Sequence, residues 1–173
     1  MITLSVPGSL EYRDVAVRVV GAACKLFGPP KRDDRRASEP VAAVAPEEKA
    51  RGELADAFVM AVVSAFSEAF NNLALHGYRG VTDKSALGRI DIKVYAQPID
   101  DESGAVVIEV TDTGHAFDPA QYLELPDELP ERGMGLFIIR SFMDEIRYEK
   151  GPPHTLTLVK RWSLASSTAA ASP

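Results

Sequence analysis

The sequence predicts an α/β fold of the α+β sandwich type, in which a mixed, mainly antiparallel sheet is covered on one face by helices. Three observations predict it. Short segments with alternating or β-branched apolar residues, typical of strands, stand before, between and after helical stretches. An acidic, glycine-containing turn at residues 100–104 joins two of these strands as a hairpin. A long amphipathic stretch from about Gly52 supplies an apolar stripe to pack on the sheet.

The first half of the chain is predicted to contain one strand and two helices. Residues 2–6 alternate as a short strand, and a helix follows from residue 10 or 11 to Phe27, with Ser9 as its N-cap. Residues 29–50 are charged and rich in alanine and proline without periodicity, so a flexible insertion is expected there. The second helix then carries the apolar stripe Leu54, Phe58, Val62, Phe66, Phe70 and Leu73.

The second half of the chain is predicted to be mostly strands. Loops are expected at 78–87 and 118–132, the latter with at most one short helix, and a helix at 135–143. The expected strands are 90–94, 105–111, 146–149 and 155–161. One domain should therefore span residues 1–162, followed by a disordered tail at 163–173.

Composition narrows the classes of function. The 173 residues and the 46% hydrophobic fraction suit one core. The net charge of -6 argues against a general binder of nucleic acids or anionic membranes, which needs a basic surface. The lone Cys24 excludes an intrachain disulfide and is expected to be a buried core thiol. No positively charged leader or membrane-spanning apolar run is recognised, so a soluble, cytoplasmic protein is expected.

The first motif places three polar side chains four residues apart in the second helix. Glu68, Asn72 and His76 would share one stripe of an α-helix. A carboxylate can orient a nucleophile and a carboxamide oxygen can bind a hard cation such as Mg²⁺. A solvated polar face is an equally good interpretation of these three residues alone. For His76, a structural role at the helix end is favoured.

Two further motifs follow in the second half. Asp112 ends an apolar strand and is followed by Gly114, which permits close backbone approach, although an ordinary turn would have the same residues. Gly133 and Gly135 precede a helix, where free backbone amides either are capped or bind phosphate. Arg132 beside them either neutralises a phosphate, contacts a protein partner or is a solvated side chain.

Together these motifs resemble the GHKL ATPase superfamily, named after gyrase, a heat-shock chaperone, histidine kinases and MutL. The helix with Ser-Glu-Ala-x-x-Asn and His-Gly-Tyr, and the helix with Gly-Met-Gly-Leu and Phe-Met-Asp-Glu-Ile, resemble most closely the anti-sigma factor serine/threonine kinases. The motifs stand in the family's order between residues 67 and 145. The resemblance implies the Bergerat-type nucleotide fold, with ATP held between the helices and a lid over residues 117–131.

The resemblance also implies a role for each candidate residue in binding ATP and Mg²⁺. Glu68 would be the catalytic base and Asn72 the ligand of Mg²⁺. Asp112 would accept from the adenine amino group, with Gly114 against the ring. The nucleotide would further be bound by Arg132, Gly133, Gly135 and Thr155. Ala116 stands where the family usually has a second glycine, a difference that concerns the adenine pocket.

The implied activity is transfer of phosphate to a serine or threonine of an anti-sigma antagonist, in a system where the kinase otherwise holds a sigma factor. Whether the chain forms a homodimer is left open. Two alternatives are a nucleotide-dependent binding module without appreciable kinase activity and a detached histidine-kinase ATP-binding domain. Glu68 favours the kinase over the binding module. The residues before Glu53 lack a phospho-acceptor helix, which disfavours the histidine kinase.

Overall fold

The computed structural model describes residues 1–31, 46–81, 87–115 and 134–164 of the chain. Its strands form one five-stranded sheet in the order β1-β2-β3-β5-β4. Every neighbouring pair is antiparallel. The strands are β1 (Ile2–Pro7), β2 (Arg89–Asp100), β3 (Ser103–Asp112), β4 (Glu145–Glu149) and β5 (His154–Ser163).

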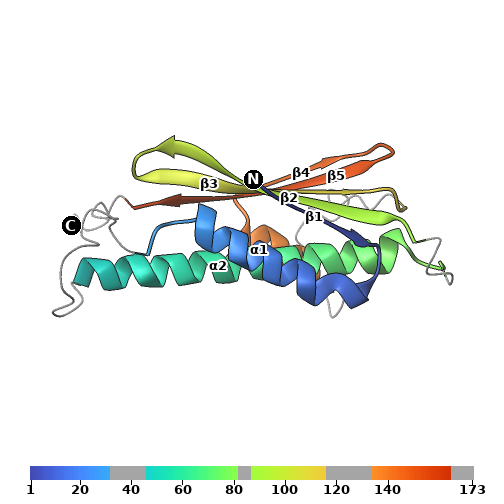
Figure 1. Ribbon diagram of the computed structural model, residues 1–173, viewed down its shortest axis with the longest axis horizontal. Coiled ribbons are helices and arrows are strands. Elements are labelled where there is room, and N and C mark those ends of the chain that lie inside the picture. The colour runs from blue at the N-terminus through green and yellow to red at the C-terminus, as the bar shows by residue number, and fades with distance from the viewer. Residues whose placement is uncertain (32–45, 82–86, 116–133, 165–173) are drawn as a thin grey trace, which may run out of the picture.

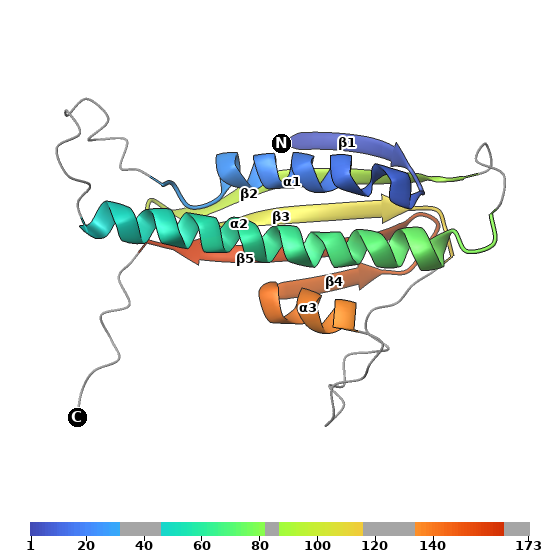
Figure 2. The ribbon, with the colours of Figure 1, turned by 90° about the horizontal axis from the view of Figure 1, so that it is seen from below.

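The helices lie together on one face of this sheet, which confirms the predicted two-layer fold (Figure 1). They are α1 (Arg13–Phe27), α2 (Pro46–Asn72) and α3 (Met134–Phe142). Figure 2 shows α2 lengthwise beneath the sheet, with α1 along one side of it and α3 along the other. All neighbouring pairs of its described strands are antiparallel, so the sheet is not mixed. The strands β3 and β4, which are connected through α3, run in the same direction, but β5 lies between them.

The first helical segment is capped at Ser9 and ends at Gly28, although α1 itself begins only at Arg13. The Ser9 hydroxyl accepts from the backbone N–H of Glu11 at 3.3 Å and starts a short 3₁₀ turn, Leu10–Tyr12, ahead of α1. At the other end the N–H of Gly28 donates to the Cys24 carbonyl at 2.8 Å. Cys24 itself is buried, and burial raises the pKa of its thiol to about 12, so the expected core thiol is confirmed.

The second helix begins earlier than its sequence pattern indicates. It starts at Pro46, so residues 46–50 are helical and the predicted insertion does not extend to residue 50. Proline suits the first position of a helix, where its missing N–H has no intrahelical partner. The apolar periodicity on which the expectation rested begins only near Leu54, after this polar turn.

The length and composition of 48–77 are those of a possible membrane-spanning helix, which corrects the expectation that no such run exists. In the structure this stretch packs on the sheet. Phe58, Val62, Phe66 and Phe70 are each at most 5% exposed. It is the core helix of the part of the chain that the structure describes.

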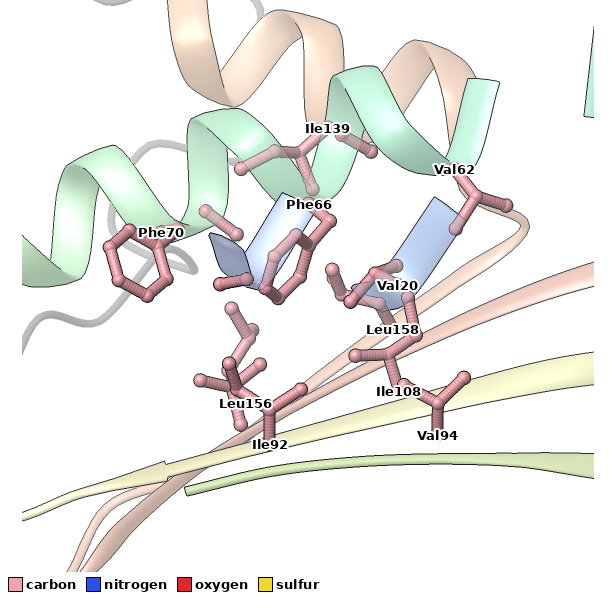
Figure 3. Packing of buried hydrophobic residues seen from close by; sticks show 14 of the residues in the cluster. Val20, Val62, Phe66, Phe70, Ile92, Val94, Ile108, Ile139, Leu156 and Leu158 are labelled. Atoms are coloured by element: carbon pink, nitrogen blue, oxygen red, sulfur yellow. The ribbon is translucent and has the colours of Figure 1, made fainter. Parts of the chain in front are cut away.

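The main core lies between the helices and the inner face of the sheet (Figure 3). Phe66 and Phe70 point from α2 toward the sheet, where they meet side chains of the three central strands. Their rings lie 6.1 Å apart and are tilted by 52°. The sheet contributes Ile92, Val94, Ile108, Leu156 and Leu158, while Val20 comes from α1 and Ile139 from α3. The same residues therefore fix α2 over the middle of the sheet.

The hairpin between β2 and β3 turns at residues 101–102, as predicted. The Asp100 carboxylate accepts from the N–H of Glu102 at 2.9 Å. Leu164 N–H donates to the Glu102 carbonyl at 2.7 Å, and Ser163 belongs to β5. These two residues are ordered by the hairpin, so the predicted tail does not begin at 163. The predicted loop and lid residues from 116 to 133, and the tail from 165, lie outside the described residues.

Candidate functional site

The first part of the site is the face of α2 that meets the start of α3. Glu68 and Asn72 are one helical turn apart, and both are partly buried. A Cβ atom added at Gly135 would lie 2.7 Å from Oε2 of Glu68 and 3.6 Å from Nδ2 of Asn72. The first turn of α3 thus lies beside both side chains, and it approaches Glu68 so closely because residue 135 has no side chain.

The end of α2 is the second part of the site. After Asn72 the helix widens into a π-helical segment, Leu73–Gly77, a distortion often found at functional sites. The Gly77 carbonyl at its end accepts from the N–H of His115 at 2.7 Å. Tyr78, which follows, donates its hydroxyl proton to the Arg89 carbonyl at 3.0 Å. The end of α2 is thereby held against both the loop after β3 and the start of β2.

Asp112 is the buried polar group of the site. It ends β3 and is 3% exposed, and its Oδ1 accepts from the N–H of Gly114 at 2.8 Å. Burial raises the pKa of this carboxyl above its ordinary value, whereas the hydrogen bond from Gly114 and the charge of His154 lower it. The hydrogen bond from Gly114 engages one oxygen, and the second is the natural acceptor for a ligand's donor.

The backbone beside Asp112 leaves no room for a side chain at Gly114. A Cβ atom at Gly114 would lie 2.5 Å from the Gly77 carbonyl oxygen and 3.1 Å from Oδ1 of Asp112. A Cβ at Gly77 would in turn lie 3.7 Å from the same Oδ1. Gly114 therefore lets the loop after β3 lie against the end of α2 beside the Asp112 carboxylate, whereas a side chain at Gly77 would meet only ordinary van der Waals contacts.

Thr155 lies apart from the other predicted site residues, on the opposite face of the sheet from Asp112. Its hydroxyl lies 3.4 Å from that of its strand partner Thr111, so both side chains are on the same face of the sheet. Side chains alternate along a strand, which puts Asp112 on the opposite, helix-covered face. That Thr155 helps to bind the adenine base, as the family resemblance implies, stays a prediction. The residue of β5 directly opposite Asp112 is His154.

His154 is the residue that sequence reasoning missed, since the pattern around it suggests no partner. Only the register of β3 with β5 brings it opposite Asp112.

Among the other predicted residues, Arg132 and Gly133 lie outside the described residues, as does Ala116. The structure thus brings together Glu68, Asn72 and Gly135 at one place and Asp112 and Gly114 at the other, with the last turns of α2 between them.

The side chains present at the site suit Mg²⁺ bound together with a nucleotide better than a metal ion coordinated by protein groups alone. Nδ2 of Asn72 is buried and has no hydrogen-bond partner among the described residues. Within the described parts of the chain, no group of three His, Cys, Asp or Glu side chains could hold a metal. Mg²⁺ commonly takes one or two protein oxygens and completes its shell with water and phosphate. The oxygen of the Asn72 carboxamide suits that mode, and its unpartnered Nδ2 is a donor that suits a phosphate oxygen.

Comparisons with known proteins agree with this geometry. The model of the histidine kinase-like ATPase domain matches residues 32–160, well over half of the chain. The chain is 33% identical over 105 residues to the serine-protein kinase RsbW of Staphylococcus aureus, an alignment that covers 56% of this chain and 61% of that protein. It is 32% identical over 108 residues to the anti-sigma F factor of Priestia megaterium, covering 60% of this chain and 68% of that protein. The chain thus spans somewhat under two thirds of the kinase that it matches.

These matches agree with the antiparallel sheet, the helix layer and the Asp112 carboxylate beside Gly114 already described, and they confirm the superfamily resemblance. The chain belongs to the histidine kinase-like ATPase domain family.

Proposed function

We propose that this chain is an anti-sigma regulatory serine/threonine kinase, which binds ATP with Mg²⁺ and phosphorylates an anti-sigma antagonist in a partner-switching system. The observation that carries the proposal is the close approach of Gly135, in the first turn of α3, to the Glu68 carboxylate and the Asn72 carboxamide. A base, a cation ligand and a helix N-terminus that favours phosphate are the parts that phosphoryl transfer needs. The names of the two similar proteins support the same assignment.

Each side chain has a distinct task in this proposal. Asp112 accepts from the exocyclic amino group of adenine, and the absence of a side chain at Gly114 lets the base approach the backbone. Asn72 offers its oxygen to Mg²⁺, and the N-terminal turn of α3 with Gly135 meets the phosphates. Glu68 takes the proton from the attacking hydroxyl. ATP supplies the phosphoryl group, and Mg²⁺ offsets the charge on its oxygens.

The proposed partners are proteins. The substrate is an anti-sigma antagonist, and a sigma factor is the proposed target that the kinase holds when the antagonist is absent. The net charge of -6 disfavours direct contact with nucleic acid or an anionic membrane, and a cytoplasmic location follows from such partners. A homodimer would be compatible with these roles.

Affinity capture from the native cell extract tests the assignment as a kinase. The immobilised chain should recover an antagonist or a sigma factor, and the set of captured proteins should change when ATP and Mg²⁺ are added. The recovered antagonist should gain phosphoserine or phosphothreonine in the presence of the chain. An antagonist that binds but stays unmodified under saturating ATP would favour the nucleotide-dependent binding module.

Asp112→Asn is expected to weaken the binding of ATP markedly. Asparagine replaces an acceptor-only group by one that presents a competing donor toward the adenine amino group. Calorimetry with ATP and Mg²⁺ measures the change. Asp101→Asn, at the exposed hairpin turn, is the matched control and should bind as wild type does. A wild-type protein that gives no heat at millimolar ATP would contradict the nucleotide site itself.

Gly135→Ala is expected to reduce phosphotransfer by about a hundredfold, the scale associated with an ångström of misplacement. The new methyl group would displace Oε2 of Glu68, and that carboxylate can swing away without unfolding the chain. Initial rates at saturating ATP measure the loss. Gly52→Ala is the control, because nothing lies within 4 Å of a Cβ at that position of α2. Full activity in Gly135→Ala would mean that Glu68 does not act from its position beside α3.

A further inference from the structure

His154 and Asp112 form a facing pair at one end of the sheet. They are direct partners in the antiparallel pairing of β3 with β5. Side chains of such partners lie on the same face about 5 Å apart at Cβ. The preceding pair on that face, Val110 and Leu156, belongs to the main core, so His154 and Asp112 stand on the side of the sheet that the helices cover.

Two contacts orient the His154 imidazole. The backbone N–H of Gly151 donates to Nδ1 at 3.2 Å. The ring stacks on that of Tyr148 from β4, with centroids 6.2 Å apart and planes inclined by 18°. A neutral imidazole whose Nδ1 accepts a hydrogen bond carries its proton on Nε2. His154 therefore presents one N–H donor from a ring that is held in place on its other side.

The pair combines an acceptor with a donor on one face. Asp112 is an acceptor through its second carboxylate oxygen, and His154 is a donor through Nε2. The edge of adenine has the complementary set, an amino group that donates and ring nitrogens that accept. We propose that His154 is a base-contacting residue of this site, which donates to a ring nitrogen of the adenine while Asp112 accepts from its amino group. This inference rests on the proposed function, because it takes an adenine nucleotide as the ligand.

His154→Phe tests the inference, since phenylalanine keeps a ring against Tyr148 and removes the donor. The dissociation constant for ATP should rise about three- to tenfold, the range for one lost hydrogen bond. Affinity for inorganic tripolyphosphate, which has no base, should stay at the wild-type value. Thr157→Val is the matched control, because side chains alternate along β5 and that of Thr157 lies on the opposite face of the sheet from His154, and it should leave both affinities unchanged.

A second measurement uses the wild-type protein and does not depend on the folding of a variant. The side-chain resonances of His154 can be assigned by NMR through elimination, with His76→Gln and His115→Gln, because the chain has three histidines. They should shift on addition of ATP and stay in place with tripolyphosphate. Unchanged His154 resonances at saturating ATP, or wild-type ATP affinity in His154→Phe, would overturn the role of His154 alone. A wild-type protein that binds no ATP would instead overturn the proposed function, and this inference with it.

Discussion

Glu68→Gln is expected to lower the rate of phosphotransfer by about a hundred- to ten-thousandfold while leaving the affinity for ATP nearly unchanged. Glutamine keeps the length and shape of the side chain but has no group that takes up a proton. A general base contributes on this scale. Because Glu68 lies against the first turn of α3, the substitution changes the chemistry at the phosphate end and leaves Asp112 untouched.

The measurement pairs two readouts on the same preparation. Phosphate incorporation into the recovered antagonist gives the rate, and calorimetry with ATP and Mg²⁺ gives the affinity. Glu53→Gln is the matched control, since Glu53 lies on the same helix with its side chain 72% exposed and pairs only loosely with Lys49 at 3.9 Å. Equal rates for Glu68→Gln and wild type would show that Glu68 is not the base. That result would favour the nucleotide-dependent binding module over the kinase.

Phe66→Ala is expected to lower the free energy of unfolding by about 3–5 kcal/mol, the range for a buried phenylalanine. Phe66 is fully buried where α2 crosses the sheet, and its ring points toward the side chains of the central strands (Figure 3). Its truncation removes apolar contact and leaves a cavity that a close-packed core fills only in part. Glu68 and Asn72 follow on the same helix, so the loss would also loosen the site.

Urea denaturation measures this loss through the midpoint and the slope of the transition. Met60→Ala on the same helix is the control, because Met60 is 69% exposed and its removal should change stability by no more than about 0.5 kcal/mol. A Phe66→Ala protein as stable as Met60→Ala would mean that α2 is not held on the sheet by this side chain.

Most elements were predictable because each is specified by a local pattern. The alternation in β1 and β2, the Ser9 cap and the apolar stripe of α2 all depend on residues close together in the sequence. The start of α2 was predicted too late, since a polar first turn at Pro46 has no apolar periodicity to mark it. The extension of β5 through Ser163 depends on its pairing with β3, which local pattern does not contain.

The sequence by itself determined the chemistry that this chain offers. The carboxylate and carboxamide of Glu68 and Asn72 share a face because four residues make about one turn of a helix, and Gly135 was recognisable from its place before an apolar helix.

Only the tertiary structure decided which groups meet. The pairing of β3 with β5 sets Thr155 beside Thr111 on the open side of the sheet and puts His154 opposite Asp112. The side chains of a strand alternate, so a shift of one residue in register exchanges the two faces. That register is set by contacts between residues more than forty positions apart, and no local pattern of residues carries it.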